Sequence, residues 1–553
     1  MGSTRIWGRA LFLSGACAAA MLASPRAQAR TYNVTPSSSC SLALAIQAVN
    51  TQTGQGSCLA GDGNADTINL ASGTYTFTNT LYISRSVVLD GAGVGSTIVR
   101  SNMASDSQLF WVIGQSGGIT VRFVEMTIDK ASTQTYPTVT GIYVSGDAST
   151  SAGVYVERSR VAGHTWSGVF ADDAHITIND STIESNSSPG PGGGIGVQAN
   201  GGTASIFTHE STINNNTSQD SGGGVYFGGN TQSQLINTTV SSNTALRGGG
   251  VAYNATDWSN GYFNLVSSTV TANSASQTGG GVYTPQYQPG IYEPNFVISG
   301  TIVANNFAHF LQDWDGHLHV TTDSLISDTF GLSEIDVEQG INFYDVDPLL
   351  DSVLRDLGGP YHTKVHRLLP GSPAIDVLSS STSTDQRHVL RPQLGRTSAS
   401  MSDIGAYEET RQETELLTVA AKTAGVSHVV VNASQYSNGQ GTNLQSTLVN
   451  QFVTYSTPAS LPSGTYQITV GFKKGSNAGR FQFAVASSLG GTYTNLGAVQ
   501  DGYASSNTWT SVTLPNHTFG SSSTKYLRFT VVSKNGSSTG YQVFPDYITI
   551  TKQ

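Results

Sequence analysis

Short apolar runs recur between residues 180 and 305 at a nearly constant spacing, and one motif begins each of them. A small residue and then Thr precede Ile or Val, and Asn follows three positions later, at intervals of 27 to 32 residues. A fixed period of this length without a helical pattern predicts a parallel β-helix with one repeat in each coil. The apolar residues of the motif are expected to stack as one buried column: Ile183, Ile213, Val240, Val270 and Ile302.

The asparagines of the motif have a structural interpretation. In stacked coils each side-chain amide lies over its predecessor and can bond the turn backbone of the neighbouring coil. Divergent copies at Met126-Thr127-Ile128 and Ser159-Arg160-Val161 extend the array toward the N-terminus. The asparagines concerned are Asn186, Asn216, Asn243, Asn273 and Asn305.

A different pattern begins after the solenoid. Alternating apolar runs such as Tyr466 to Phe472 and Tyr526 to Val532 are separated by Gly, Ser and Asn turns. This spacing predicts an antiparallel β-sandwich. The expected division is a β-helix over 30–408, a polar connector over 409–425 and a sandwich over 426–553. The fold class is therefore all-β.

The N-terminus has the pattern of a signal peptide over residues 1–29. Arg5 and Arg9 precede an apolar stretch, and Ala27-Gln28-Ala29 forms a small-residue cleavage site. Lipidation at Cys17 is an alternative. No later run of ~18 apolar residues is present, so no other membrane span is expected. We expect a secreted or cell-surface protein.

Export also decides how the remaining cysteines are interpreted. Cys40 and Cys58 are the only two cysteines after the signal segment. In an oxidising compartment such a pair predicts a disulfide, and two cysteines are too few for a structural zinc site. The bridge is expected in a cap over the open end of the solenoid.

Charge excludes one class of partner. Only 11% of the residues are charged and the net charge is −10. Such a chain has no basic surface for a nucleic acid. Its polarity comes from hydroxyl and amide groups, which suits an extracellular β-structure.

Several motifs after residue 340 resemble a known family. They are Leu368-Leu369-Pro370-Gly371-Ser372-Pro373-Ala374-Ile375-Asp376, Thr384-Asp385-Gln386-Arg387 and Asp403-Ile404-Gly405-Ala406-Tyr407-Glu408, together with Cys40-Ser41-Leu42. They resemble secreted bacterial β-helix proteins that end in the so-called choice-of-anchor Q domain. The resemblance implies a right-handed, pectate-lyase-like β-helix with a closing segment. It leaves activity open, since such proteins include both glycan-cleaving enzymes and non-catalytic surface proteins. His388 stands where the family usually has Gly, so that turn is expected to differ.

A second resemblance concerns the sandwich. The stretch Pro462-Ser463-Gly464-Thr465-Tyr466-Gln467-Ile468-Thr469-Val470 resembles carbohydrate-binding modules that are appended to glycan-active enzymes. Tyr436, Tyr503 and Trp509 are its candidate aromatics for stacking on sugar rings. Packing in the core is the competing interpretation, because aromatics on a β-sandwich are usually core residues.

A candidate site follows from aligning the coils. If the repeated Ile or Val points inward, alternation directs the residues one and three before it, and one after it, outward. Charge at these positions is concentrated on the first four coils: Glu125, Arg158, Arg160, Asp180, Glu184 and Glu210. Carboxylates one or two coils apart match the separations in glycosidases, and the arginines suit a uronate carboxylate. The alternative is a ladder of ion pairs between coils on a solvated face.

Two other clusters are weaker. Asp172, Asp173 and His175 precede a strand and are interpreted as turn residues. A second group resembles a metal cluster by composition, but its spacing matches no zinc signature: His309, Asp313, Asp315, His317 and His319. We therefore assign no metal or cofactor, with calcium binding through carboxylates left open.

The preferred function is extracellular processing of an acidic polysaccharide by a lyase or a glycoside hydrolase, with the sandwich binding the same polymer. The alternatives are a non-catalytic surface or adhesion protein and a structural component of an envelope or matrix. We expect a monomer.

Overall fold

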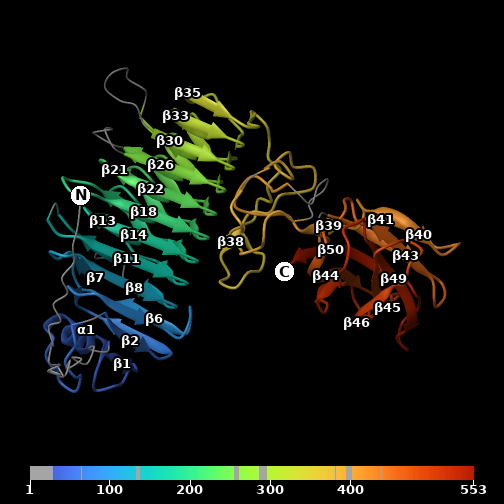
Figure 1. Cartoon of the computed structure of the whole chain (residues 1–553), viewed down its shortest axis with the longest axis horizontal. Helices are drawn as coiled ribbons and strands as arrows, with labels where there is room; N and C mark the ends of the chain where they lie inside the picture. The colour runs from blue at the N-terminus through green and yellow to red at the C-terminus, as the bar shows by residue number, and fades with distance from the viewer. Residues whose placement is uncertain are drawn as a thin grey trace, which may run out of the picture.

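The computed structural model describes residues 29–63, 65–131, 138–147, 149–254, 261–285, 295–379, 381–393, 401–437 and 439–553. All but the last residue of the predicted signal peptide, Cys17 included, lies outside these ranges. The described chain is nearly all β. Its parallel strands stack as a β-solenoid, and antiparallel sheets follow near the C-terminus (Figure 1). Both predicted parts of the fold are confirmed.

Each coil contributes strands to three long sheets and, in the later coils, to a short fourth one. Sheet I contains β4 (Leu81–Ile83), β7 (Ser107–Ile113), β10 (Val139–Ser145), β13 (Val169–Asp172), β17 (Ile195–Gln198), β21 (Val225–Gly228), β25 (Val251–Asn254) and β29 (Val282–Tyr283). Sheet II contains β1 (Thr31–Val34), β2 (Asp66–Leu70), β5 (Val87–Asp90), β8 (Ile119–Val124), β11 (Ala152–Glu157), β14 (His175–Asn179), β18 (Ser205–His209), β22 (Gln232–Ile236), β26 (Tyr262–Val266), β30 (Asn295–Ser299) and β35 (Leu332–Gln339). The long strand β33 (Trp314–Thr322) pairs with both sheets.

Sheets III and IV complete the coil. Sheet III contains β3 (Gly73–Phe77), β6 (Thr97–Ser101), β9 (Thr127–Lys130), β12 (Arg160–Ala162), β15 (Thr182–Glu184), β19 (Thr212–Asn214), β23 (Thr239–Ser241), β27 (Thr269–Thr271), β31 (Ile302–Ala304), β34 (Leu325–Ile326) and β36 (Phe343–Tyr344). Sheet IV contains β16 (Ser187–Ser188), β20 (Thr217–Ser218), β24 (Thr244–Arg247), β28 (Ser274–Thr278) and β32 (Phe307–Phe310). The regular copies of the repeat motif thus lie at sheet III strands β15, β19, β23, β27 and β31.

The buried column is confirmed for four coils and shifted by one residue in the fifth. Ile183 pairs with Ile213, and the column continues through Val240 and Val270. Val270 then pairs with Val303, so Ile302 takes the position held by Thr269 in the previous coil. Ile302 is still buried because residues of the closing segment cover it. The prediction that Ile302 belongs to this column is therefore wrong.

The asparagine ladder shows the same shift. Each buried Asn donates from Nδ2 to Oδ1 of the next one at 2.9–3.0 Å, in the order Asn186, Asn216, Asn243, Asn273 and Asn306. Asn306 replaces the predicted Asn305 because Gly300, with a φ of 56°, takes the corner position that Ser267 holds in the previous coil. Asp313 ends the ladder by accepting from Asn306 Nδ2 at 2.9 Å.

The N-terminal end is capped as predicted. Helix α1 (Leu42–Thr51) begins at Ser41, whose hydroxyl accepts from the Leu44 amide, and its buried face joins the solenoid core. Cys40 and Cys58 form a disulfide with their Cα atoms 4.8 Å apart. Within the described residues, no helix is long and apolar enough to cross a membrane.

The segment after β36 folds back along the outside of sheet III; we call residues 345–408 the closing segment. Its strands are β37 (Arg355–Asp356) and β38 (Lys364–Val365), and Figure 1 shows it between the solenoid and the C-terminal sheets. The outward Thr row of the repeat motif is bonded to it. Thr212 Oγ1 accepts from the Lys364 amide at 2.8 Å, and Thr239 Oγ1 donates to Gln386 Oε1 at 2.6 Å. Thr212 and Thr239 are consequently buried.

The C-terminal part contains two antiparallel sheets that enclose a separate core. One contains β39 (Arg411–Glu413), β44 (Gly464–Lys474), β47 (Thr508–Thr513), β48 (His517–Phe519) and β50 (Phe544–Lys552). The other contains β40 (Thr418–Lys422), β43 (Phe452–Ser456), β45 (Gly479–Ala486), β46 (Thr494–Asp501) and β49 (Tyr526–Lys534), and a hairpin pairs β41 (Ser427–Asn432) with β42 (Gln440–Gln445). The stretch expected as a connector, 409–425, thus carries two strands of these sheets.

Candidate functional site

The charged positions three residues before the motif apolar residue lie at corners between sheets II and III. Glu125, Arg158, Asp180 and Glu210 all have φ between 46° and 53°, the left-handed region that non-glycine residues rarely adopt. They were predicted as outward residues of a strand, and the structure places each of them in a two-residue corner between two strands. Their side chains therefore project from the corner between sheets II and III and not from the flat face of a sheet.

Two pairs of the predicted charge strip neutralise each other across neighbouring coils. Arg158 Nε lies 2.9 Å from Glu125 Oε1, and Arg160 Nε lies 2.6 Å from Glu184 Oε1. Lys364 of the closing segment adds a contact of 3.5 Å to Glu184. For these residues the structure has the ion-pair ladder that the sequence left as the alternative to a site.

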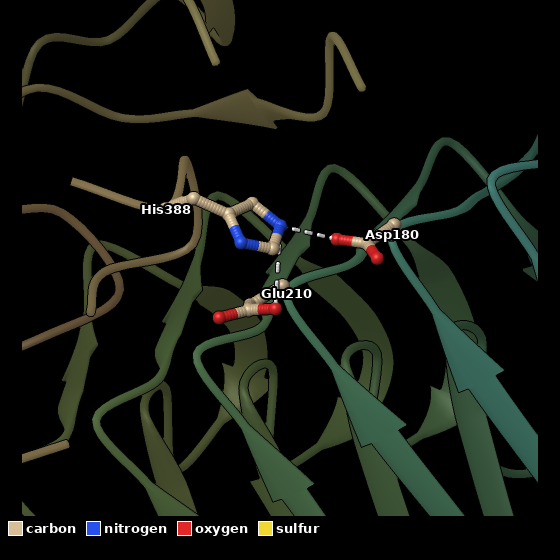
Figure 2. Close-up of side chains that lie close together, drawn as sticks. All are labelled: Asp180, Glu210 and His388. Carbon is tan, nitrogen blue, oxygen red and sulfur yellow. Dashed lines mark hydrogen bonds and ion pairs between the residues drawn. The ribbon is translucent and has the colours of Figure 1, made fainter. Parts of the chain in front are cut away.

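The other two residues of the strip meet a partner from the closing segment. His388 Nε2 lies 2.6 Å from Asp180 Oδ1 and 3.3 Å from Glu210 Oε2 (Figure 2). Thr384 Oγ1 donates to the second oxygen of Glu210 at 2.9 Å. Residues from two coils and from a segment more than 170 positions later in the chain thus form one cluster. We call it the His388 cluster.

The turn that carries His388 is held in an unfavourable conformation. The φ of His388 is 64°, which favours glycine, and Asp385 fixes the surrounding backbone. Its carboxylate accepts from the amides of Arg387 and Val389 at 2.8 and 3.0 Å. The buried Arg387 guanidinium binds the same carboxylate and stacks 3.9 Å from the ring centroid of Tyr407. Surroundings that determine a strained residue this firmly are found at functional sites.

Electrostatics favour a protonated His388. The hydrogen bond to Asp180 raises the pKa of His388, burial opposes the rise, and the charge of Glu210 adds to it. The edge of Tyr361 meets the imidazole with ring centroids 5.3 Å apart, and Arg158 lies over Tyr361 at 5.8 Å. The cluster therefore brings together an imidazolium that can donate a proton and carboxylates that can accept one.

The same three side chains could also bind a divalent cation. One oxygen each of Asp180 and Glu210 and one nitrogen of His388 lie within 4.8 Å of one another. Two carboxylates and an imidazole are a ligand set that zinc, manganese and similar ions accept. Sequence analysis noted His388 only as a departure from the family and gave it no role. The available signal was a histidine at a position where the turn requires a positive φ.

A groove lies on the outer face of sheet II, where its strands begin. It has a volume of about 800 Å³ and crosses β8, β11, β14, β18 and β22. Figure 1 shows these strands side by side along the solenoid. Tyr155, His175 and Phe207 line it together with hydroxyl and amide side chains. It has no residue in common with the His388 cluster.

Of the three predicted turn residues only Asp173 lies in the turn, because Asp172 ends β13 and His175 begins β14. Asp173 has a φ of 49° and accepts from the amides of Asn200 and Gly202 at 2.7 and 2.9 Å. Asp172 accepts from the Asn200 side chain at 2.8 Å. His175 lines the groove on sheet II, which the sequence did not indicate.

The five residues that resemble a metal cluster do not converge. Asp313 ends the asparagine ladder, and Asp315 accepts from Thr278 at 2.6 Å. His317 and His319 each contact one oxygen of Asp336, at 2.9 and 2.7 Å. The ring of His309 packs edge-on against Phe310. Glu334, which the sequence analysis had not included, lies with His317 and Asp336.

The aromatic residues predicted to bind sugar in the sandwich differ in exposure. Tyr436 is only 4% exposed and packs edge-on against Trp509, with ring centroids 5.5 Å apart. Its ring is therefore unavailable for stacking, and the core interpretation applies to it. Trp509 and Tyr503 are partly exposed.

Comparisons with known proteins give partial likenesses. No family model and no curated protein matches the chain. Among solved structures, a Paenibacillus xanthan lyase is 24% identical with a TM-score of 0.23, over 28% of this chain and 15% of that one. A family 35 carbohydrate-binding module from an environmental isolate is 18% identical with a TM-score of 0.20, over 26% of this chain and 93% of the module. A module of Cellvibrio mixtus lichenase 5A in complex with cellotriose is 15% identical with a TM-score of 0.19, over 26% and 96%.

The three solved structures named above are a polysaccharide lyase and two carbohydrate-binding modules. This chain spans about 15% of the length of the xanthan lyase and nearly all of each module. Likenesses of this size assign no activity to the chain.

Proposed function

We propose that this protein processes an extracellular polysaccharide by acid–base catalysis at the His388 cluster, as a lyase or a glycoside hydrolase. The observation that carries the proposal is the position of His388 Nε2 between two carboxylates from neighbouring coils. Its positive φ supports a functional reason for a residue larger than glycine at this turn.

The three side chains of the cluster supply an acid and a base for either reaction. In hydrolysis the imidazolium protonates the glycosidic oxygen while a carboxylate activates water. In elimination a carboxylate removes a proton from the sugar carbon and the imidazolium protonates the leaving oxygen. One oxygen each of Asp180 and Glu210 lies within 4.8 Å of a nitrogen of His388, so the acid and the base lie side by side.

The arginines of the strip receive a different role from the one the sequence suggested. Both guanidinium groups already bind carboxylates, Arg158 to Glu125 and Arg160 to Glu184. Binding a uronate would require breaking these pairs, so the proposal assigns the arginines to positioning the corner. Preference for an acidic polymer stays a prediction from the sequence.

A panel of neutral and uronate-containing polysaccharides tests the proposal. Reducing ends without ultraviolet absorbance indicate a hydrolase, and unsaturated products indicate a lyase. His388→Gly suits the backbone of the turn and removes the acid, so turnover should fall by roughly 10²–10⁴-fold with the fold retained. Asp180→Asn and Glu210→Gln should behave similarly, and Asp129→Asn, which alters only an ion pair with Arg100, is the control. Repeating the panel with a chelator tests for calcium.

A non-catalytic adhesion protein is the second candidate. It is favoured by the two closed ion pairs of the strip, which need no ligand to explain their charge. Binding of a polysaccharide without any product, unchanged in all three cluster variants, would support this candidate and reject catalysis.

A further inference from the structure

We propose that the groove on sheet II is a binding site for a chain of uncharged sugars, extended along the solenoid axis. This goes beyond the proposed activity, because the groove and the His388 cluster have no residue in common. The site would exist whether or not the cluster catalyses a reaction.

The first argument is the charge of the lining. The sixteen residues that line the groove include no Asp, Glu, Lys or Arg. Burial lowers the pKa of His175, so its imidazole is neutral at pH 7. Arg122, next to Tyr155 in the same outward row, lies over that ring and is paired with Glu157 at 2.6 Å, and the Asp173 carboxylate accepts from the Gly202 amide. A ligand carboxylate would find no free cation among these residues, whereas hydroxyl groups meet neutral hydrogen-bonding partners.

The second argument is the spacing of the aromatic side chains. Tyr155, Thr177 and Phe207 belong to one outward row on β11, β14 and β18, so the two aromatic residues are two coils apart. Neighbouring strands lie about 4.8 Å apart, which places the two rings about 10 Å apart along the axis. An extended pyranose chain with two-fold symmetry presents the same face of every second sugar at a similar interval. Phe207 is 37% exposed, so its ring is accessible to a ligand.

The third argument is the row of hydrogen-bonding groups beside the aromatic row. Thr120, His175, Ser205 and Gln232 occupy one outward row on neighbouring strands, and Gly153 interrupts it on β11. His175 Nδ1 and Ser205 Oγ lie 2.8 Å apart, which fixes the orientation of both. Aromatic surface on one side and oriented polar groups on the other match a sugar, which has an apolar face and a hydroxyl edge.

Gly153 provides a sharp test of occupancy. A Cβ built on it meets nothing closer than 3.9 Å, and its backbone does not require a positive φ. The Gly153→Leu variant should therefore fold normally, and its leucine side chain should fill the floor of the groove. Phe207→Ala removes an aromatic contact without filling space. Phe307→Ala is the matched control, because Phe307 is an exposed solenoid phenylalanine on β32, outside the groove.

The experiment is titration calorimetry of the full chain with neutral β-1,4-linked hexasaccharides of glucose, xylose and mannose, and with a hexagalacturonate. We expect at least one neutral hexamer to bind. Phe207→Ala should weaken the affinity for this hexamer about tenfold, and Gly153→Leu should abolish its binding. Phe307→Ala and His388→Gly should bind as the wild type does, and the hexagalacturonate should not compete.

Other outcomes overturn the proposal. If no neutral hexamer binds, or if Gly153→Leu and Phe207→Ala bind like the wild type, the groove is not the site and any binding belongs to the sandwich. If hexagalacturonate competes as well as the neutral hexamer, the argument from charge fails. Loss of turnover in His388→Gly with this binding intact separates the two proposals, since each then succeeds or fails on its own measurement.

Discussion

Sheets II and III are built from the same coils, yet the outer face of sheet III is covered and that of sheet II is open. On sheet III the outward hydroxyl groups of Thr212, Thr239 and Thr269 are bonded to the closing segment and buried. On sheet II the corresponding rows line an open groove. The alternation of residues is the same on both faces. A periodic pattern therefore identifies which side chains leave the core, whereas segments far away in the chain decide whether they support the fold or meet a ligand.

The largest effect on stability is expected where the closing segment contacts the sandwich. Arg367 is about 4% exposed and binds Glu409 at 2.8 Å as well as Glu413 on β39. Arg367→Met would leave two buried carboxylates without their cation, so the free energy of unfolding should fall by about 3–5 kcal/mol. Urea unfolding followed by tryptophan fluorescence measures this.

Arg355→Met is the control for that variant. Arg355 is half exposed and binds Asp351 at 3.1 Å, so its loss should change stability by less than about 1 kcal/mol. Equal effects of the two substitutions would mean that the closing segment does not depend on the buried ion pair.

The second prediction concerns the end of the asparagine ladder. Burial raises the pKa of Asp313 to about 6, against 3.8 for an unperturbed carboxyl. Between these values the folded state binds more protons than the unfolded chain, so stability should fall as the pH rises from about 4 to 6. The loss approaches about 3 kcal/mol and persists at pH 7.

Asp313→Asn keeps the acceptor for Asn306 and removes the charge. It should raise stability at pH 7 and flatten the dependence on pH, as measured by thermal unfolding at several pH values. Glu334→Gln, on the exposed part of a neighbouring strand, is the control. An unchanged pH dependence in Asp313→Asn would show that another group is responsible.

The third prediction compares one residue type on the two faces. Thr212 Oγ1 exchanges hydrogen bonds with the backbone of Lys364 and accepts from Gln386. Thr212→Val would leave a buried amide without its acceptor, which destabilises by about 1–3 kcal/mol. Thr177→Val, in the groove on sheet II, should change stability by less than about 0.5 kcal/mol. Similar losses in thermal unfolding would mean that the groove face is also covered.

Much of the fold could be predicted because the repeat is local. The motif around Ile183 and Asn186 recurs once per coil, so the column, the ladder and the solenoid follow from spacing alone. The one-residue shift at Ile302 could not be predicted, because it depends on Gly300 taking the left-handed corner. The sandwich strands were recognisable by alternation, but the strands within 409–425 were not, since their polar residues resemble a connector.

The candidate site was predictable only in part. The pattern selected Asp180 and Glu210 together with four charged residues that pair among themselves. It could not supply His388, because His388 meets Asp180 across 208 positions of sequence, a separation that no local pattern encodes. The groove was missed as well, because neutral residues such as Thr177 and Phe207 do not stand out in a search for charge.

The smallest effect on stability is expected from the protonation of His388, where the closing segment contacts the solenoid. The pKa of His388 is raised above 6.5 in the folded state, chiefly by its hydrogen bond to Asp180. A raised histidine pKa stabilises the fold fully below pH 6.5, and this contribution is lost as the pH rises through the folded value. The stability of the wild type, measured by thermal unfolding, should therefore fall from pH 6 to 8. The stability of His388→Gly should not show this dependence on pH. Glycine also relieves the positive φ, so the variant should lose little stability at pH 8. If both proteins weaken equally between pH 6 and 8, His388 does not couple protonation to the contact with Asp180, and the acid–base role of the cluster loses its electrostatic basis.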